Sequence, residues 1–75
     1  MRTDKELERI YLNFPDRLSS ILARKGLTNR DITHKMAVSA STVINWLNGV
    51  SKPDMLSIFK LANALGISTD ELLGF

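Results

Sequence analysis

The sequence contains no cysteine and only one histidine, and these shortages exclude several kinds of site. Without cysteine the chain can form neither a disulfide nor a thiolate metal site. A single histidine with no paired ligand spacing leaves no set of side chains suited to zinc. We therefore expect no metal and no cofactor, and the fold must depend on its hydrophobic core.

Long hydrophobic runs are also missing. No stretch approaches the roughly 20 apolar residues that a helix needs to cross a bilayer. The first ten residues, MRTDKELERI, are rich in charge and lack the apolar segment of a secretory signal. From these two absences we expect a soluble intracellular protein with no membrane partner.

The patterns that mark an enzyme are absent as well. The sequence has no glycine-rich phosphate loop and no pair of carboxylates in an apolar setting. Ser41 and His34 could be named as nucleophile and base, but no pattern supplies a third residue to orient them. We expect no catalytic residue and no enzymatic activity.

The charges that are present lie unevenly along the chain. A net charge of +2 permits a nucleic-acid partner without requiring one. Residues 1–26 carry six basic and four acidic groups, whereas residues 27–75 carry four of each. No charged side chain lies between Lys35 and Lys52. The 75 residues suffice for one small domain.

Six short helical patterns and no strand pattern predict an all-α fold. Each pattern has a recognisable start or stop, such as a polar N-terminal cap, a capping box, a first-turn proline or a terminal glycine. The capping signals are Thr3 with Glu6, Thr28 with Asp31, Ser39, Asp54, and Ser68 with Glu71. We divide the chain into an N-terminal extension helix within residues 1–13 and a domain in residues 14–75.

Residues 28–49 form the most informative segment. Two short helical patterns lie there almost end to end, separated by a turn of three to four residues around Ala37, Val38 and Ser39. Because so short a turn prevents parallel packing, the second helix must cross the first at a steep angle. Such a crossing pushes the outer face of the second helix away from the protein, as groove-binding helices require.

The second of these helices has one apolar side and one uncharged polar side. Val43, Trp46 and Leu47 form the apolar stripe, so we expect Trp46 in the core and not on a stacking surface. Ala40, Ser41, Ile44, Asn45 and Asn48 lie opposite. Asparagine can pair with adenine, serine can contact several bases, and a methyl group suits the methyl of thymine.

An ordinary solvated helix could also show such a polar face. Ile44 fits that interpretation poorly, because an exposed branched apolar side chain suits a thymine methyl or a protein partner better than water. Around the face, helix starts near Asn29 and Ser39 offer backbone N–H groups to phosphates. We expect His34 to lie on the surface of the first helix.

Several sequence blocks then resemble a known family. They are Leu27-Thr28-Asn29, Val38-Ser39-x-Ser41-Thr42-Val43-x-x-Trp46-x-x-Gly49, Lys52-Pro53, and Leu61-Ala62-x-Ala64-Leu65-Gly66-Ile67-Ser68-x-Asp70-Glu71-Leu72-Leu73. In order and spacing, from about Pro15 to Leu73, they resemble the lambda repressor and Cro type of helix-turn-helix domain, found in Xre-like regulators. The resemblance implies a compact five-helix domain, here with an additional short N-terminal helix.

The resemblance also implies a DNA-binding role. Related domains bind double-stranded operator DNA as homodimers, and the helix at about residues 40–48 would then lie in the major groove. Asn29 and Asn48 match phosphate-binding positions, Ala40, Ser41 and Asn45 match base-contacting positions, and Lys52 matches a basic loop. The full expected DNA-binding set is Asn29, Arg30, Ser39, Ala40, Ser41, Thr42, Ile44, Asn45, Asn48 and Lys52.

Three positions depart from the family pattern. Thr33 stands where alanine is usual, and Ala37 stands where glycine is usual, so the turn must form without the freedom of glycine. Ala40 replaces the glutamine or arginine that often leads base reading, which shifts specificity towards Ser41, Asn45 and DNA shape. Residues 3–12 match no part of the family.

Our leading hypothesis is a sequence-specific transcriptional regulator, a phage- or prophage-type repressor acting in the bacterial cytoplasm at the nucleoid. The alternative is a protein-interaction module on the same fold, similar to an antirepressor or antitoxin. A further domain or protein partner is compatible with either hypothesis. The dimer surface could be the C-terminal edge (Leu72, Leu73, Phe75) or the N-terminal helix (Leu7, Ile10, Tyr11), unless both merely cap the core.

Overall fold

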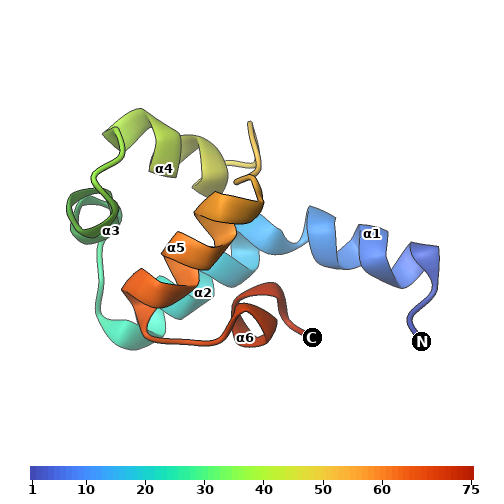
Figure 1. Ribbon diagram of the computed structural model, residues 1–75. Coiled ribbons are helices and arrows are strands. Elements are labelled where there is room, and N and C mark those ends of the chain that lie inside the picture. The colour runs from blue at the N-terminus through green and yellow to red at the C-terminus, as the bar shows by residue number, and fades with distance from the viewer.

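Six helices and no strand make up the chain, as the sequence predicts (Figure 1). The computed structural model describes all of residues 1–75. In chain order the helices are α1 (Asp4–Leu12), α2 (Phe14–Lys25), α3 (Asn29–Met36), α4 (Ala40–Leu47), α5 (Met55–Leu65) and α6 (Thr69–Leu73). None of them combines the length and the apolar composition that crossing a membrane requires.

Polar side chains begin most of these helices, as predicted. At α1 the Thr3 hydroxyl accepts the N–H of Glu6, and the Glu6 carboxylate accepts the N–H of Thr3 in return. Ser39 and Asp54 cap α4 and α5 with single hydrogen bonds. A bond of this kind satisfies one of the N–H groups that a helix start leaves without an intrahelical partner.

The capping box predicted for α6 is wrong in one half. The N–H of Glu71 donates to the Ser68 hydroxyl at 3.0 Å, but the Glu71 carboxylate makes no return bond. The backbone of Glu71 is held from another side, since its carbonyl accepts Arg17 Nε at 2.9 Å and Arg17 Nη2 at 2.7 Å. This pair of bonds ties α6 to α2 across 54 residues of sequence.

The core is formed by α2 to α6. Eleven apolar side chains are buried in one cluster: Phe14, Leu18, Ile21, Leu22, Ile32, Val43, Trp46, Leu61, Ala62, Leu65 and Leu72. Trp46 is 4 % exposed, which confirms its predicted place in the core. Full burial of a large aliphatic side chain stabilises a fold by about 1.5–3 kcal/mol, so this cluster fixes how α4 is presented.

Helix α1 contributes no buried residue and projects from the body next to the start of α2 (Figure 1). Leu7, Tyr11 and Leu12 all remain exposed. Ile10 is half-buried, so α1 lies over the edge of the domain without adding a residue to the core. At the other terminus Leu72 does lie in the core, whereas Phe75 is half exposed.

Candidate nucleic-acid interface

The turn between α3 and α4 forms without glycine. Ala37 adopts a left-handed conformation with φ 55° and ψ 38°. Its N–H donates to the carbonyl of His34, and the N–H of Val38 donates to the carbonyl of Thr33 at 3.3 Å. Val38 packs against the core directly after the turn. This pattern is the usual glycine-terminated helix ending, and alanine adopts it at a cost of about 1–2 kcal/mol.

Thr33 fits the crossing of α3 and α4 by bonding within its own helix. Its hydroxyl donates to the carbonyl of Asn29 at 2.8 Å, one turn earlier. The side chain is half-buried, and a buried hydroxyl without a partner would be costly. The internal bond removes that cost, so the larger residue is accommodated where the family usually has alanine.

Helix α4 presents the face that the sequence predicts. Val43 and Trp46 are buried, and Leu47 packs against the same cluster. On the opposite side Ala40, Ser41, Ile44 and Asn48 are exposed, and Thr42 and Asn45 are half-buried. Ile44 is 41 % exposed, so an apolar side chain does lie on this uncharged surface.

Three hydroxyl groups at the start of α4 bond to one another. Ser39 Oγ lies 3.1 Å from Ser41 Oγ and 2.7 Å from Thr42 Oγ1, and it also accepts the N–H of Thr42 at 3.3 Å. A hydroxyl has one donor and two acceptor sites, so these three bonds use the full capacity of Ser39. Its side chain therefore positions α4 and has no hydrogen bond left for a phosphate.

The same accounting leaves one hydroxyl proton free on the neighbouring residues. Ser39 accepts the Thr42 N–H, accepts one hydroxyl proton and donates its own proton to the other hydroxyl. Of Ser41 and Thr42, therefore, one has committed its proton to Ser39 and the other can still donate outward. Either residue can in addition accept a hydrogen bond from a base or from water.

The starts of α3 and α4 differ in charge. The first N–H groups of each helix have no intrahelical partner and point towards any anion at that end. At α3 a carboxylate already occupies this place, because Asp31 accepts the Thr28 N–H at 2.8 Å. At α4 the first turn contains no acidic residue. The N–H groups of Ala40 and Ser41 are therefore better suited to bind a phosphate than those at the start of α3.

Asp31 stays ionised at neutral pH. The hydrogen bonds from the Thr28 backbone and hydroxyl hold the pKa of this carboxyl below its usual range, and Lys35 and Arg30 reinforce the effect. Arg30, His34 and Lys35 are exposed and surround Asp31 in a shallow hollow on α3. His34 is thus a surface residue, as predicted.

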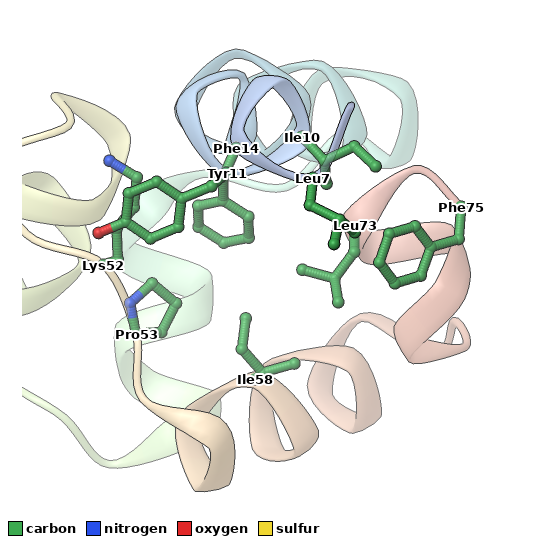
Figure 2. Close-up of a pocket in the computed structure, with 9 residues that line it drawn as sticks. All are labelled: Leu7, Ile10, Tyr11, Phe14, Lys52, Pro53, Ile58, Leu73 and Phe75. Carbon is green, nitrogen blue, oxygen red and sulfur yellow. The ribbon is translucent and has the colours of Figure 1, made fainter. Parts of the chain in front are cut away.

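Lys52 is half-buried and lies in the loop between α4 and α5. Its Nζ is 4.8 Å from the centroid of the Tyr11 ring, so the loop after α4 is joined to α1 by a cation–π contact (Figure 2). Such a contact stabilises by about 0.5–2 kcal/mol. Sequence reasoning missed this pairing, because the two side chains lie 41 positions apart and follow no shared pattern.

The structure also shows an exposed apolar surface on α5, where the sequence alone does not distinguish exposed from buried apolar residues. Met55 is 74 %, Leu56 59 % and Phe59 55 % exposed, and all three lie on α5. We call these three residues the α5 patch. A signal was present in the sequence, since α5 carries apolar residues on more than one side, which indicates a second apolar contact.

Comparisons with known proteins agree with this geometry. The family described as "Helix-turn-helix" matches residues 18–72. No curated protein matches the chain. Among solved structures, a transcriptional regulator from Listeria innocua is 34 % identical, with a TM-score of 0.72. The similarity covers 83 % of this chain and 58 % of that one, so this chain spans little more than half the length of the matched protein.

The family match takes in both helices of the α3–α4 pair and nearly the whole core that holds them. Residues 1–17, including α1, lie outside it. The chain therefore belongs to the helix-turn-helix family of the lambda repressor and Cro (Xre-like) type, whose members are DNA-binding transcriptional regulators and not enzymes.

Proposed function

We propose that this chain binds operator DNA sequence-specifically as a transcriptional repressor of phage or prophage type, with α4 in the major groove. The observation that carries the proposal is the outer face of α4. It is uncharged and exposed, and it begins at an N-terminus with free N–H groups and no carboxylate. A charged face would lose more solvation free energy than an uncharged one on entering a groove. An exposed Ile44 also favours a surface that contacts a partner over one that contacts only water.

Within this proposal the residues divide by role. Ser41, Ile44 and Asn45 contact base edges, and Ala40 leaves room for a thymine methyl. Asn29, Arg30, Asn48 and Lys52 hold phosphates around the rim, and Thr42 lies beside the backbone. Ser39 sets the position of α4 through its saturated hydroxyl. Such a regulator acts in the cytoplasm, where bacterial DNA lies.

We further propose that two copies bind together through the α5 patch. The two dimer surfaces suggested by the sequence face each other across one cavity, since Leu7, Ile10 and Tyr11 line it with Leu73 and Phe75. The α5 patch lies one short loop after α4. A two-fold axis through this patch would pair two copies so that their α4 helices contact half-sites about one helical turn (~34 Å) apart.

A selection from randomised DNA duplexes tests the function. We expect enrichment of a two-fold symmetric sequence, and binding that weakens steeply with salt because phosphate contacts release counterions. Lys52→Ala should weaken all sequences alike and lower the salt slope by about 1. If no sequence is enriched and no duplex binds at low salt, the proposal is wrong. Capture of a protein by the α4 face would then favour an antirepressor-like or antitoxin-like module.

A further inference from the structure

A cavity of about 250 Å³ lies between α1 and the body of the domain (Figure 2). Helix α1 lines it with Leu7, Ile10 and Tyr11, and the C-terminal end lines it with Leu73 and Phe75. These side chains come from the two ends of the sequence and surround one common space. The helix-turn-helix match begins only at residue 18, so α1, which forms one wall, lies outside the family domain.

The size and walls of the cavity favour a small aromatic molecule. Seven of its nine lining residues are hydrophobic, including Phe14 of α2 and Ile58 of α5. An apolar cavity of about 150 Å³ stays dry and binds benzene. The larger volume here accommodates a fused two-ring aromatic, and burying such a ring removes apolar surface from water on both partners.

The charges at the cavity favour an acid. The only charged lining residue is Lys52, which is half-buried and lies on the Tyr11 ring. At the far end the guanidinium of Arg2 lies 5.0 Å from the centroid of the Phe75 ring. No carboxylate lines the cavity. Of the nearby acids, Asp54 directs its carboxylate to the N–H of Ser57. An anionic group at the Tyr11 edge of the cavity therefore meets the ammonium of Lys52 and no lining carboxylate (Figure 2).

We propose that this cavity binds a small aromatic carboxylic acid, with its rings among the apolar walls and its carboxylate on the ammonium group of Lys52. The ammonium has three donors and no acceptor, and a half-buried charge pairs more strongly than an exposed one. This binding site needs no DNA and stands independently of the proposed function.

A regulatory consequence rests on the proposed function. If Lys52 holds a DNA phosphate, the bound acid and the phosphate compete for the same ammonium group. Occupancy of the cavity then weakens DNA binding, and DNA weakens binding of the acid by the same factor. We expect about a fivefold effect, at the low end of typical coupling between two ligands, because only one of several phosphate contacts is involved.

The cavity is tested on the full chain labelled with ¹⁵N, by titration with 1-naphthylacetate and its neutral analogue 1-naphthylacetamide. We expect a dissociation constant on the order of 0.1–1 mM for the acid, and roughly tenfold weaker binding of the amide. Amide-resonance shifts should cluster around Tyr11, Ile58 and Leu73. Equal affinities for the two probes, or shifts confined to other regions, would overturn the proposal.

Three variants separate the walls from the charge. Leu7→Trp fills the cavity from an exposed position on α1, so it should abolish binding of both probes without disturbing the core. Lys52→Met should reduce the acid to the affinity of the amide and leave the amide unchanged. Lys60→Met, at an exposed lysine of α5 outside the cavity, is the matched control and should change neither. A Leu7→Trp chain that is folded but still binds both probes contradicts the site.

Two further measurements complete the test. If the apparent affinity for the acid falls as protein concentration rises, a second copy occupies the cavity and the small-molecule proposal is wrong. In the second measurement, binding of the chain to the selected duplex is measured with the acid present at about ten times the dissociation constant of the acid. We expect the acid to weaken DNA binding about fourfold in the original chain and to leave DNA binding by Lys52→Met unchanged. Unchanged DNA binding in both overturns the regulatory part, whereas failure to bind any duplex overturns only the proposed function.

Discussion

At the scale of single residues, the interface depends on a few backbone and hydroxyl details. Ala37 carries the left-handed turn, Thr33 satisfies its hydroxyl inside α3, and Ser39 uses every hydrogen bond it has. None of these residues needs to contact DNA to matter for binding. Each sets the angle or the position at which α4 meets its target.

The left-handed turn makes a stability prediction. Ala37→Gly should relieve a steric cost of about 1–2 kcal/mol in the folded state. Against this gain, the greater flexibility of the unfolded chain should lower the stability by about 0.5–1 kcal/mol. We expect the free energy of unfolding to rise by about 0.5–1 kcal/mol, which is a few degrees in melting temperature. Thermal unfolding by circular dichroism measures this. Ala23→Gly, at an exposed helical position of α2, should instead destabilise by about 0.5–1 kcal/mol. A loss of stability in Ala37→Gly would show that the turn is not strained.

Asn45 is the residue on which specificity should depend most. Asn45 is half-buried and lies on the outer face of α4. Asn45→Ala should cost about 1–3 kcal/mol at one base position and leave the other positions unchanged. Binding to a set of single-base operator variants measures this. Asn63→Ala, at an exposed asparagine of α5, is the control. Uniform weakening across the set would assign Asn45 to a phosphate.

At the scale of helices, the sequence predicted the elements well because their signals are local. Caps such as Thr3, Thr28 and Asp54 act over three or four residues, so the structure confirms the helices that they begin. The contacts that failed prediction join distant segments. Arg17 bonding to Glu71, and Lys52 lying on Tyr11, depend on how the helices pack, which no local pattern encodes.

The start of α5 makes a pH prediction. Hydrogen bonding from Ser57 holds the pKa of Asp54 below its ordinary value of 3.8, with a smaller contribution from Lys60. A carboxyl with a depressed folded pKa stabilises the fold at pH values above its unfolded pKa, and this contribution is lost as pH falls through the folded value. Stability should therefore decline below about pH 4.

Melting temperatures of the original chain and Asp54→Asn, measured from pH 7 down to pH 2.5, test this prediction. Asparagine is also a good N-cap, so the variant keeps the cap but loses the ionisable group. The difference between the two chains should shrink below about pH 4. Glu8→Gln, at an exposed position of α1, is the control. A difference that is constant with pH would mean that Asp54 contributes no charge-dependent stability.

At the scale of the whole molecule, exposed apolar surface is the property that the sequence least determined. Leu61, Ala62 and Leu65 are apolar residues of the same helix as Met55, Leu56 and Phe59. Only packing decides that the first three are buried and the others exposed. The outer face of α4 was predictable because the apolar stripe on its opposite side is short and regular. Helix α5 has two apolar sides, and no local pattern shows which of them is buried.

The α5 patch makes a prediction about assembly. Leu56→Asp places a charge on a side chain that is 59 % exposed, so the fold should be retained while self-association is lost. Sedimentation at several concentrations should show a monomer, and binding to an operator with two half-sites should weaken more than binding to one half-site. Leu12→Asp, on α1 at 69 % exposure and outside the cavity, is the control. If Leu56→Asp still dimerises, the α5 patch is not the interface.

Because no charged side chain lies between Lys35 and Lys52, the overall affinity for DNA and the ranking of operators should depend on different residues. Every charge available to phosphates lies at the rim, so ionic strength acts on all operators by the same factor. The ranking of strong and weak operators should therefore stay the same from dilute to concentrated salt, while total occupancy changes. A cell whose internal salt concentration rises would release all of its sites together and keep the order in which they refill.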